Sequence, residues 1–155
     1  MNPLLERNAF SLDAFADESN RIEGMGPASP SEVAALAALL SRHPVLTISD
    51  LVDYVKVCQP NARPRFSQGL NVYVGNYQAP RGGPNIQAVL QTILDKAAPR
   101  SADAYEIHVA YEKLHPFTDG NGRSGRALWL WCMGGIARAP LGFLHHFYYQ
   151  TLQHS

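Results

Sequence analysis

Apolar residues recur every three or four positions through most of the chain, a spacing that predicts amphipathic helices. The first expected helix covers Ser11 to Ile22, with the serine as its N-cap, and ends at Gly24. The second begins at Ser29, where Pro30 suits the first helical position and Glu32 completes a capping box. The chain therefore opens with two short helices joined by a linker.

Further helices are expected over Thr47 to Cys58, Asn85 to Ala98, Ser101 to Leu114, Arg123 to Met133 and Leu141 to Leu152. Ser101 is the expected N-cap of its helix. The segment Arg123 to Met133 is apolar along most of its length, which is typical of a central helix. The residues expected to face the core on the three helices before it are Leu51, Tyr54, Val55 and Cys58; Ile86, Val89, Leu90, Ile93 and Leu94; and Ala104, Ile107, His108, Tyr111 and Leu114.

The segment over residues 63–84 breaks the helical pattern, because proline and glycine recur along it. Within it, Leu70 to Val74 has the sequence LNVYV, which is typical of a strand and is followed by a Gly-Asn turn. The run fits a surface loop and a hairpin flap over a functional site about equally well. The sequence leaves both open.

Length and composition indicate one all-α domain over residues 1–155, with 46% hydrophobic residues to fill its core. Thirteen basic and thirteen acidic residues balance, which argues against nucleic acid or an anionic membrane as the main partner. Cys58 and Cys132 lack the spacing of a metal site and are expected to be buried thiols. With no signal peptide or membrane span in the pattern, a cytoplasmic protein is expected. Homo-oligomerisation stays open.

The densest chemistry lies in residues 115–126, HPFTDGNGRSGR. The run contains the dinucleotide fingerprint G-x-G-x-x-G, which needs a preceding strand and an acidic residue about 20 positions later. A helix is expected before it, and no Asp or Glu follows Asp119, so this interpretation is rejected. No Gly-Lys-Ser or Gly-Lys-Thr is present either, which excludes a P-loop.

The residue types in this loop nevertheless predict a site for polyphosphate. The amide groups of Gly120, Asn121 and Gly122 would open the next helix and form an anion site. Arg123 and Arg126 are three positions apart, and paired guanidinium groups suit phosphate oxygens.

Two further side chains of the loop supply reactive chemistry. Asp119 is a hard oxygen ligand of the kind magnesium prefers. His115 has a pKa suited to deprotonating a hydroxyl near neutral pH. A base, a metal ligand and an anion site together predict phosphoryl or nucleotidyl transfer.

The loop resembles the signature of the Fic domain, which is His-Pro-Phe, two variable residues, Gly-Asn-Gly-Arg, two more and Arg. The resemblance implies a Fic-type helical bundle with a β-hairpin flap, and transfer of AMP from ATP to a hydroxyl side chain of a target protein. It implies His115 as general base, Asp119 as the Mg²⁺ ligand and Gly120, Asn121 and Gly122 at the phosphates. Arg123 would contact the polyphosphate and Arg126 the γ-phosphate. The related Doc kinases carry lysine where this chain has Gly122, which favours AMP transfer over phosphorylation.

The run SNRIEG, at residues 19–24, resembles the inhibitory motif that some Fic proteins carry on a helix before the core. The motif pairs Ser19 with Glu23 on a helix expected over residues 11–24. The resemblance implies that Glu23 pairs with Arg126, in the position due to the γ-phosphate, and restrains the enzyme.

The resemblance also suggests a docking role for the flap over residues 63–84. Its Leu70 to Val74 run (Leu70, Asn71, Val72, Tyr73 and Val74) would offer an edge to an extended target segment. Two alternatives remain: removal of AMP from a modified target, with Glu23 orienting a water, and a nucleotide-responsive binding module with little catalysis.

Overall fold

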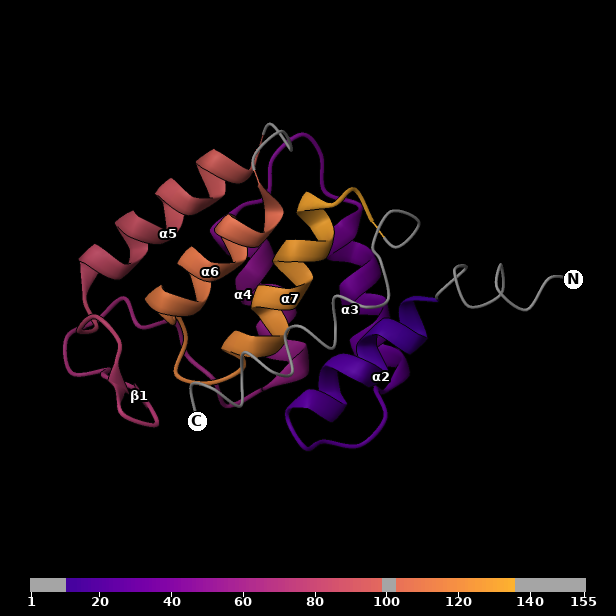
Figure 1. The fold of residues 1–155 in the computed structure, drawn as a ribbon, viewed down its shortest axis with the longest axis horizontal. Coiled ribbons are helices and arrows are strands. Elements are labelled where there is room, and N and C mark those ends of the chain that lie inside the picture. Colours follow the sequence, from indigo (N-terminus) through magenta and orange to yellow (C-terminus); the bar gives the residue numbers. More distant parts are fainter. Residues whose placement is uncertain (1–10, 99–102, 136–155) are drawn as a thin grey trace, which may run out of the picture.

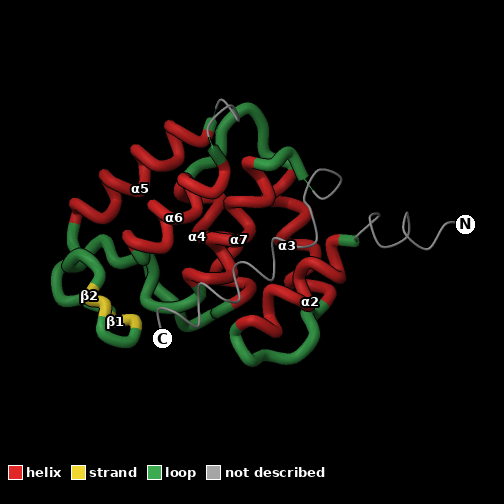
Figure 2. Tube along the Cα trace, in the orientation of Figure 1, coloured by secondary structure: helices red, strands yellow, loops and turns green. Residues whose placement is uncertain are grey.

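Helices dominate the computed structural model, which describes residues 11–98 and 103–135. Across these residues no helix has both the length and the apolar character needed to cross a membrane. The expected all-α class is confirmed, with one small hairpin added (Figures 1 and 2). In chain order the elements are α2 (Leu12–Ile22), α3 (Pro30–Leu40), α4 (Ile48–Cys58), β1 (Tyr73–Val74), β2 (Tyr77–Gln78), α5 (Pro84–Ala97), α6 (Ala104–Leu114) and α7 (Asn121–Cys132).

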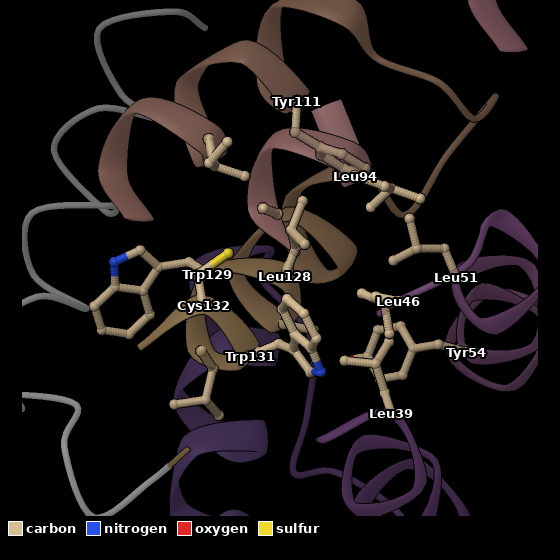
Figure 3. Packing of buried hydrophobic residues seen from close by; sticks show 14 of the residues in the cluster. Leu39, Leu46, Leu51, Tyr54, Leu94, Tyr111, Leu128, Trp129, Trp131 and Cys132 are labelled. Atoms are coloured by element: carbon tan, nitrogen blue, oxygen red, sulfur yellow. The ribbon is translucent and has the colours of Figure 1, made fainter. Parts of the chain in front are cut away.

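Helix α7 is the centre of the bundle and contacts α2, α3, α4 and α6 (Figure 1). All its residues are buried except Gly122, which lies in its first turn. Trp129 and Trp131 leave the helix in different directions, and Trp131 points towards Leu39 and Tyr54 (Figure 3). The apolar character of this segment therefore reflects burial on every side rather than on one face.

The first helices are held in place by polar contacts near their ends. Ser29 caps α3 as predicted, but the Glu32 carboxylate accepts a hydrogen bond from Asn20 Nδ2 of α2 at 2.9 Å. The expected capping box is thus only half formed, because Glu32 joins two helices instead. Asp17 Oδ1 accepts from the amide of Ala28 at 2.8 Å, which ties α2 to the start of α3 a second time.

Several details differ from the sequence-based expectations. The N-cap of α6 is Asp103 rather than Ser101, and its carboxylate accepts two amide hydrogen bonds. Val89 is 37% exposed, because α5 lies at the outside of the bundle (Figure 1) and buries only a narrow face. The strand expected over Leu70 to Val74 is reduced to its last two residues. The helix expected over Leu141 to Leu152 lies outside the described residues.

The segment over residues 63–84 contains a β-hairpin. Of the two alternatives that the sequence left open, the structure therefore shows the hairpin flap and not an irregular surface loop. Strands β1 and β2 pair antiparallel, with Tyr73 opposite Gln78 and Val74 opposite Tyr77. Near the start of this segment, Pro64 forms an antiparallel bridge with Phe117 of the Gly-rich loop. The flap and the loop are therefore in direct backbone contact.

Candidate active site

The Gly-rich loop lies between the end of α6 and the start of α7, beside a cavity of about 480 Å³. This cavity brings together residues from distant parts of the sequence: the loop, the end of α2, the end of α4 and the flap. The residues lining it are Glu23, Met25, Gln59, Val72, Tyr73, His115, Thr118, Asp119, Gly120, Asn121, Gly122 and Arg123. Every part of the predicted site except Ser19, Arg126 and three flap residues lies on this wall.

His115 closes α6 in a left-handed backbone conformation, with φ 51° and ψ 65°. Its Nδ1 lies 2.7 Å from the backbone oxygen of Glu112. A carbonyl oxygen can only accept, so Nδ1 carries the proton and Nε2 of the neutral ring keeps its lone pair. Burial lowers the pKa of His115, and the nearby Arg65 lowers it further, against the opposing effects of the Glu112 carbonyl, Glu23 and Asp119. The ring is therefore neutral near pH 7 and is able to accept a proton at Nε2.

The loop takes its shape from one buried amide side chain. Asn121 Oδ1 accepts from the backbone N–H of Phe117 at 2.9 Å, and Asn121 Nδ2 donates to the Phe117 oxygen at 2.8 Å. Phe117 itself is buried in the core. The Asn121 side chain thus supports the loop. Its direct contact with phosphate stays a prediction.

The first turn of α7 faces the cavity. Gly120 stands at the N-cap with φ 77°, a left-handed conformation that favours glycine, and it has no side chain to cover the amide groups behind it. Gly120, Asn121, Gly122 and Arg123 all line the cavity. The positive end of the α7 dipole therefore points at the enclosed space.

Arg123 is only 3% exposed and is already engaged by α4. Its Nη1 donates to the Cys58 oxygen at 2.9 Å, and its Nη2 donates to Gln59 Oε1 at 2.5 Å. The guanidinium thus satisfies a carbonyl at the end of α4 and fixes one wall of the cavity. A contact with polyphosphate stays a prediction.

Arg126 is 1% exposed and turns towards α2. Its Nε donates to Ser19 Oγ at 2.8 Å, and its Nη2 donates to the Ser19 oxygen at 3.0 Å and to Glu23 Oε1 at 2.8 Å. The pairing of Glu23 with Arg126 expected from the sequence is present in the structure. Ser19 and Glu23 lie one helical turn apart, and their contacts with one guanidinium explain that spacing.

The Glu23 carboxylate also lies directly over the first turn of α7. A β-carbon built on Gly122 would lie 2.2 Å from Glu23 Oε1 and 3.1 Å from Arg126 Nη1. The chain's own anion thus occupies the space between the helix N-terminus and an arginine. This arrangement shows that the pocket accepts a negatively charged group.

Glu112, on α6, is a titratable group beside the site that sequence reasoning missed. Its side chain is one quarter exposed, and its Oε1 lies 3.9 Å from His108 Nε2 and close to Gly125 of α7. Burial raises the pKa of Glu112 to about 7, and Glu23 adds to the increase while Arg126 opposes it. The spacing of four residues between His108 and Glu112 could have suggested the pair. His108 itself is a core histidine, as predicted, with Nδ1 3.0 Å from the Gly125 oxygen.

The flap residues divide into two groups. Val72 and Tyr73 line the cavity, and Tyr73 is 67% exposed. Leu70 and Asn71 instead hold the base of the hairpin: the Leu70 oxygen accepts from Arg65, and Asn71 Oδ1 accepts from the Gly82 amide. Val74 pairs with the second strand. Neither Arg65 nor Gln59 was expected at the site, since nothing in the local pattern marks them.

Residues 73–133 match the sequence model of the Fic/DOC family, a range that covers both flap strands, α5, α6, the loop and α7. The family includes transferases that modify proteins, and the match is compatible with AMPylation or a related nucleotidyl transfer. No curated protein sequence matches the chain significantly. The match begins at residue 73, so a single domain over residues 1–155 stays a prediction.

Proposed function

Because the chain is a Fic domain protein, we propose that it is a protein adenylyltransferase that its own α2 helix restrains. The observation that carries this proposal is the position of the Glu23 carboxylate, which lies over Gly122 and pairs with Arg126 beside the cavity that His115 lines. The space that the Glu23 carboxylate now occupies is an anion site, and in the active state a phosphate group would take the place of the carboxylate.

In the proposed reaction a hydroxyl oxygen of the target protein attacks the α-phosphorus of ATP. His115 Nε2 takes the hydroxyl proton, the bond between the α-phosphorus and its bridging oxygen breaks, and pyrophosphate leaves. The tautomer fixed by the Glu112 carbonyl supports this role, because it leaves Nε2 as the acceptor. The amide groups at the start of α7 would stabilise negative charge on the phosphates.

Asp119 fits a magnesium ligand. Its carboxylate lines the cavity and is exposed, and Oδ1 accepts from the Gly120 amide, which orients the group. Within residues 11–98 and 103–135, no three acidic, histidine or cysteine side chains gather as a metal site. An ion held by Asp119 would therefore take its other ligands from phosphate and water, as magnesium commonly does. When bound, it would neutralise phosphate charge.

The restraint would act through Arg126. While Glu23 pairs with it, the guanidinium is not available to a γ-phosphate, and the carboxylate would repel any phosphate near Gly122. Truncating Glu23 should therefore increase AMP transfer. The whole of α2 need not leave, because only the side chain at its C-terminal end blocks the pocket.

Removal of AMP from a modified target is the second candidate function. It is favoured by the exposure of the Glu23 side chain, which is 33%, and by its position on the same cavity wall as His115. A carboxylate so placed could orient a water for attack on the α-phosphorus of an AMP-modified residue.

The test uses ATP labelled at the α- or the γ-phosphate with the unmutated chain and the Glu23→Gly variant. We expect α-label on protein, and more of it with Glu23→Gly. His115→Ala in that background should abolish transfer while retaining ATP binding by calorimetry. The added Arg126→Ala change should cancel the gain, because the γ-phosphate loses its partner, and Glu18→Gln serves as the surface control.

The outcomes separate the candidates. Label from the γ-phosphate would indicate a kinase, and absence of label with every variant and target would favour a binding module. Loss of AMP from a modified target, dependent on Glu23, would indicate the reverse reaction. Transfer retained by the His115→Ala variant would refute the assigned base.

A further inference from the structure

We infer that Arg65 is a positioning residue for this reaction, joining both ends of the flap to the backbone of His115, so that a target segment on the flap is held in register with the base. The role in catalysis rests on the proposed function, but the mechanical link does not. Arg65 is 0% exposed, and its guanidinium bonds go to backbone oxygens of the flap and of α6.

On the flap side, one nitrogen holds both ends of the hairpin. Arg65 Nη1 donates to the Leu70 oxygen at 3.0 Å and to the Pro80 oxygen at 2.8 Å. These residues precede and follow the two strands. The spacing between the two arms of the flap is therefore set at this guanidinium.

On the catalytic side, the other nitrogens hold the end of α6. Arg65 Nε donates to the His115 oxygen at 2.5 Å, and Nη2 donates to the Leu114 oxygen at 2.7 Å. Carbonyl groups in the last turn of a helix lack partners within the helix and carry its negative dipole end, so a guanidinium is a favourable cap. His115 needs this support because its left-handed φ of 51° is unfavourable for a residue other than glycine.

The backbone of Arg65 continues the link. Its N–H donates to the Pro116 oxygen at 2.8 Å, and its oxygen accepts from the N–H of Gly83 at 2.9 Å. Gly83 is the N-cap of α5, so one residue contacts the loop, the flap, α5 and α6. A guanidinium offers five N–H donors in a fixed plane, whereas a lysine ammonium would be unable to reach carbonyl groups on several sides at once.

The flap also touches α6 at a second point, since Tyr77 donates its hydroxyl proton to the Lys113 oxygen at 2.7 Å. Tyr77, in strand β2 of the flap, is 40% exposed and lies at the protein surface. Arg65 is therefore the buried anchor of this connection, and Tyr77 the peripheral one. A shift of the flap would move the backbone on which the imidazole is carried.

The experiment compares Arg65→Lys and Arg65→Met with Arg81→Met, a matched control at an exposed arginine near the end of the flap. Amide hydrogen exchange is measured on each full chain, without nucleotide or target. We expect faster exchange in two separate segments of both Arg65 variants: the flap, at Ala79 and Gly83, and the loop, at His115 and Thr118, whose amides are hydrogen-bonded. Arg81→Met should match the unmutated chain.

AMP transfer is then measured in the Glu23→Gly background. We expect Arg65→Lys to lower kcat on the order of ten- to a hundredfold and to raise KM for the target, because a displacement of about 1 Å at the reacting groups has effects of this size. A structural role confined to the flap would raise KM alone. A loss of stability alone would lower the folded fraction in parallel with activity and leave KM unchanged.

The inference is overturned if exchange accelerates in only one of the two segments, or in neither, in a folded Arg65→Lys variant. If Arg65→Met does not fold, Arg65→Lys decides alone. Absence of α-label in every variant would refute the adenylyltransferase proposal, whereas coupled exchange would still support the link between flap and base.

Discussion

Substitution of Gly122 by alanine tests the position of the Glu23 carboxylate in solution. Gly122 lies in the first turn of α7, so its backbone accepts alanine, and helix propensity alone would stabilise the chain by up to about 1 kcal/mol. The new methyl group, however, would lie 2.2 Å from Glu23 Oε1. The glutamate is the flexible partner and would move away, breaking its pair with Arg126.

The size of the effect follows from the environment of that pair. Arg126 is almost fully buried, while the Glu23 side chain is 33% exposed, so solvent screens part of the interaction. A hydrogen bond to a charged group contributes about 1.5–3 kcal/mol when buried, and we discount this to about 1–2 kcal/mol here. Gly122→Ala should thus be neutral or destabilising by about 1 kcal/mol.

The assay is a double-mutant cycle on the free energy of unfolding in urea, with Glu23→Ala as the second change. Without the carboxylate the methyl group meets Arg126 Nη1 at 3.1 Å, which a shift of a few tenths of an ångström relieves, so Gly122→Ala should then be neutral or stabilise the chain. The expected coupling is about 1–2 kcal/mol, equivalent to about 2–8 °C in Tm. Equal effects of Gly122→Ala in both backgrounds would show that Glu23 does not lie over this turn.

Three other predictions concern the loop and its surroundings. Asn121→Ala should lower stability by about 2–4 kcal/mol in denaturant titrations, because two hydrogen bonds to buried Phe117 backbone groups are lost; a change within error would refute the supporting role. Because the pKa of Glu112 rises to about 7 on folding, its contribution to stability is present below the unfolded value near 4.5 and is lost as pH rises through 7. The free energy of unfolding of the Glu112→Gln variant, relative to that of the unmutated chain, should therefore increase by about 3 kcal/mol between pH 4 and pH 8. Parallel curves of the two unfolding free energies against pH would contradict this. EDTA should abolish AMP transfer by the Glu23→Gly variant and added Mg²⁺ restore it, while Asp119→Asn should raise the Mg²⁺ concentration required; an unchanged requirement would remove Asp119 as the ligand.

The helices were predictable from sequence because their signals are local. Serine caps and apolar spacing placed α2, the start of α3 and α4 within a few residues of their observed positions. At helix α6 and at Glu32 the expected capping contact is replaced by another polar contact, local in the first case and tertiary in the second. A nearby acid provided a better cap than Ser101, and a tertiary contact with Asn20 took the carboxylate that a capping box would use.

The site was predictable only where a contiguous motif carries it. The loop residues were found because they are neighbours in sequence, and Glu23 because the run SNRIEG at residues 19–24 resembles the inhibitory motif of some Fic proteins. Arg65 donates to the backbone oxygens of Leu114 and His115, 49 and 50 residues away, and Gln59 accepts from the Arg123 guanidinium, 64 residues away. No local pattern encodes such contacts, so only the folded chain shows them.

The attachment of α2 to α3 determines how the proposed restraint would respond to nucleotide. Phe15 and Ala16 of α2 lie in the core, Asn20 binds Glu32 of α3, and Asp17 binds the Ala28 amide just before α3. The Glu23 carboxylate is therefore held close to the site by the chain itself. A group tethered in this way has an effective concentration of millimolar or above. The nucleotide concentration needed to displace Glu23 would therefore depend on the chain itself and not on the abundance of a separate inhibitor. Expression level would thus change the number of enzyme molecules without changing the fraction that is restrained.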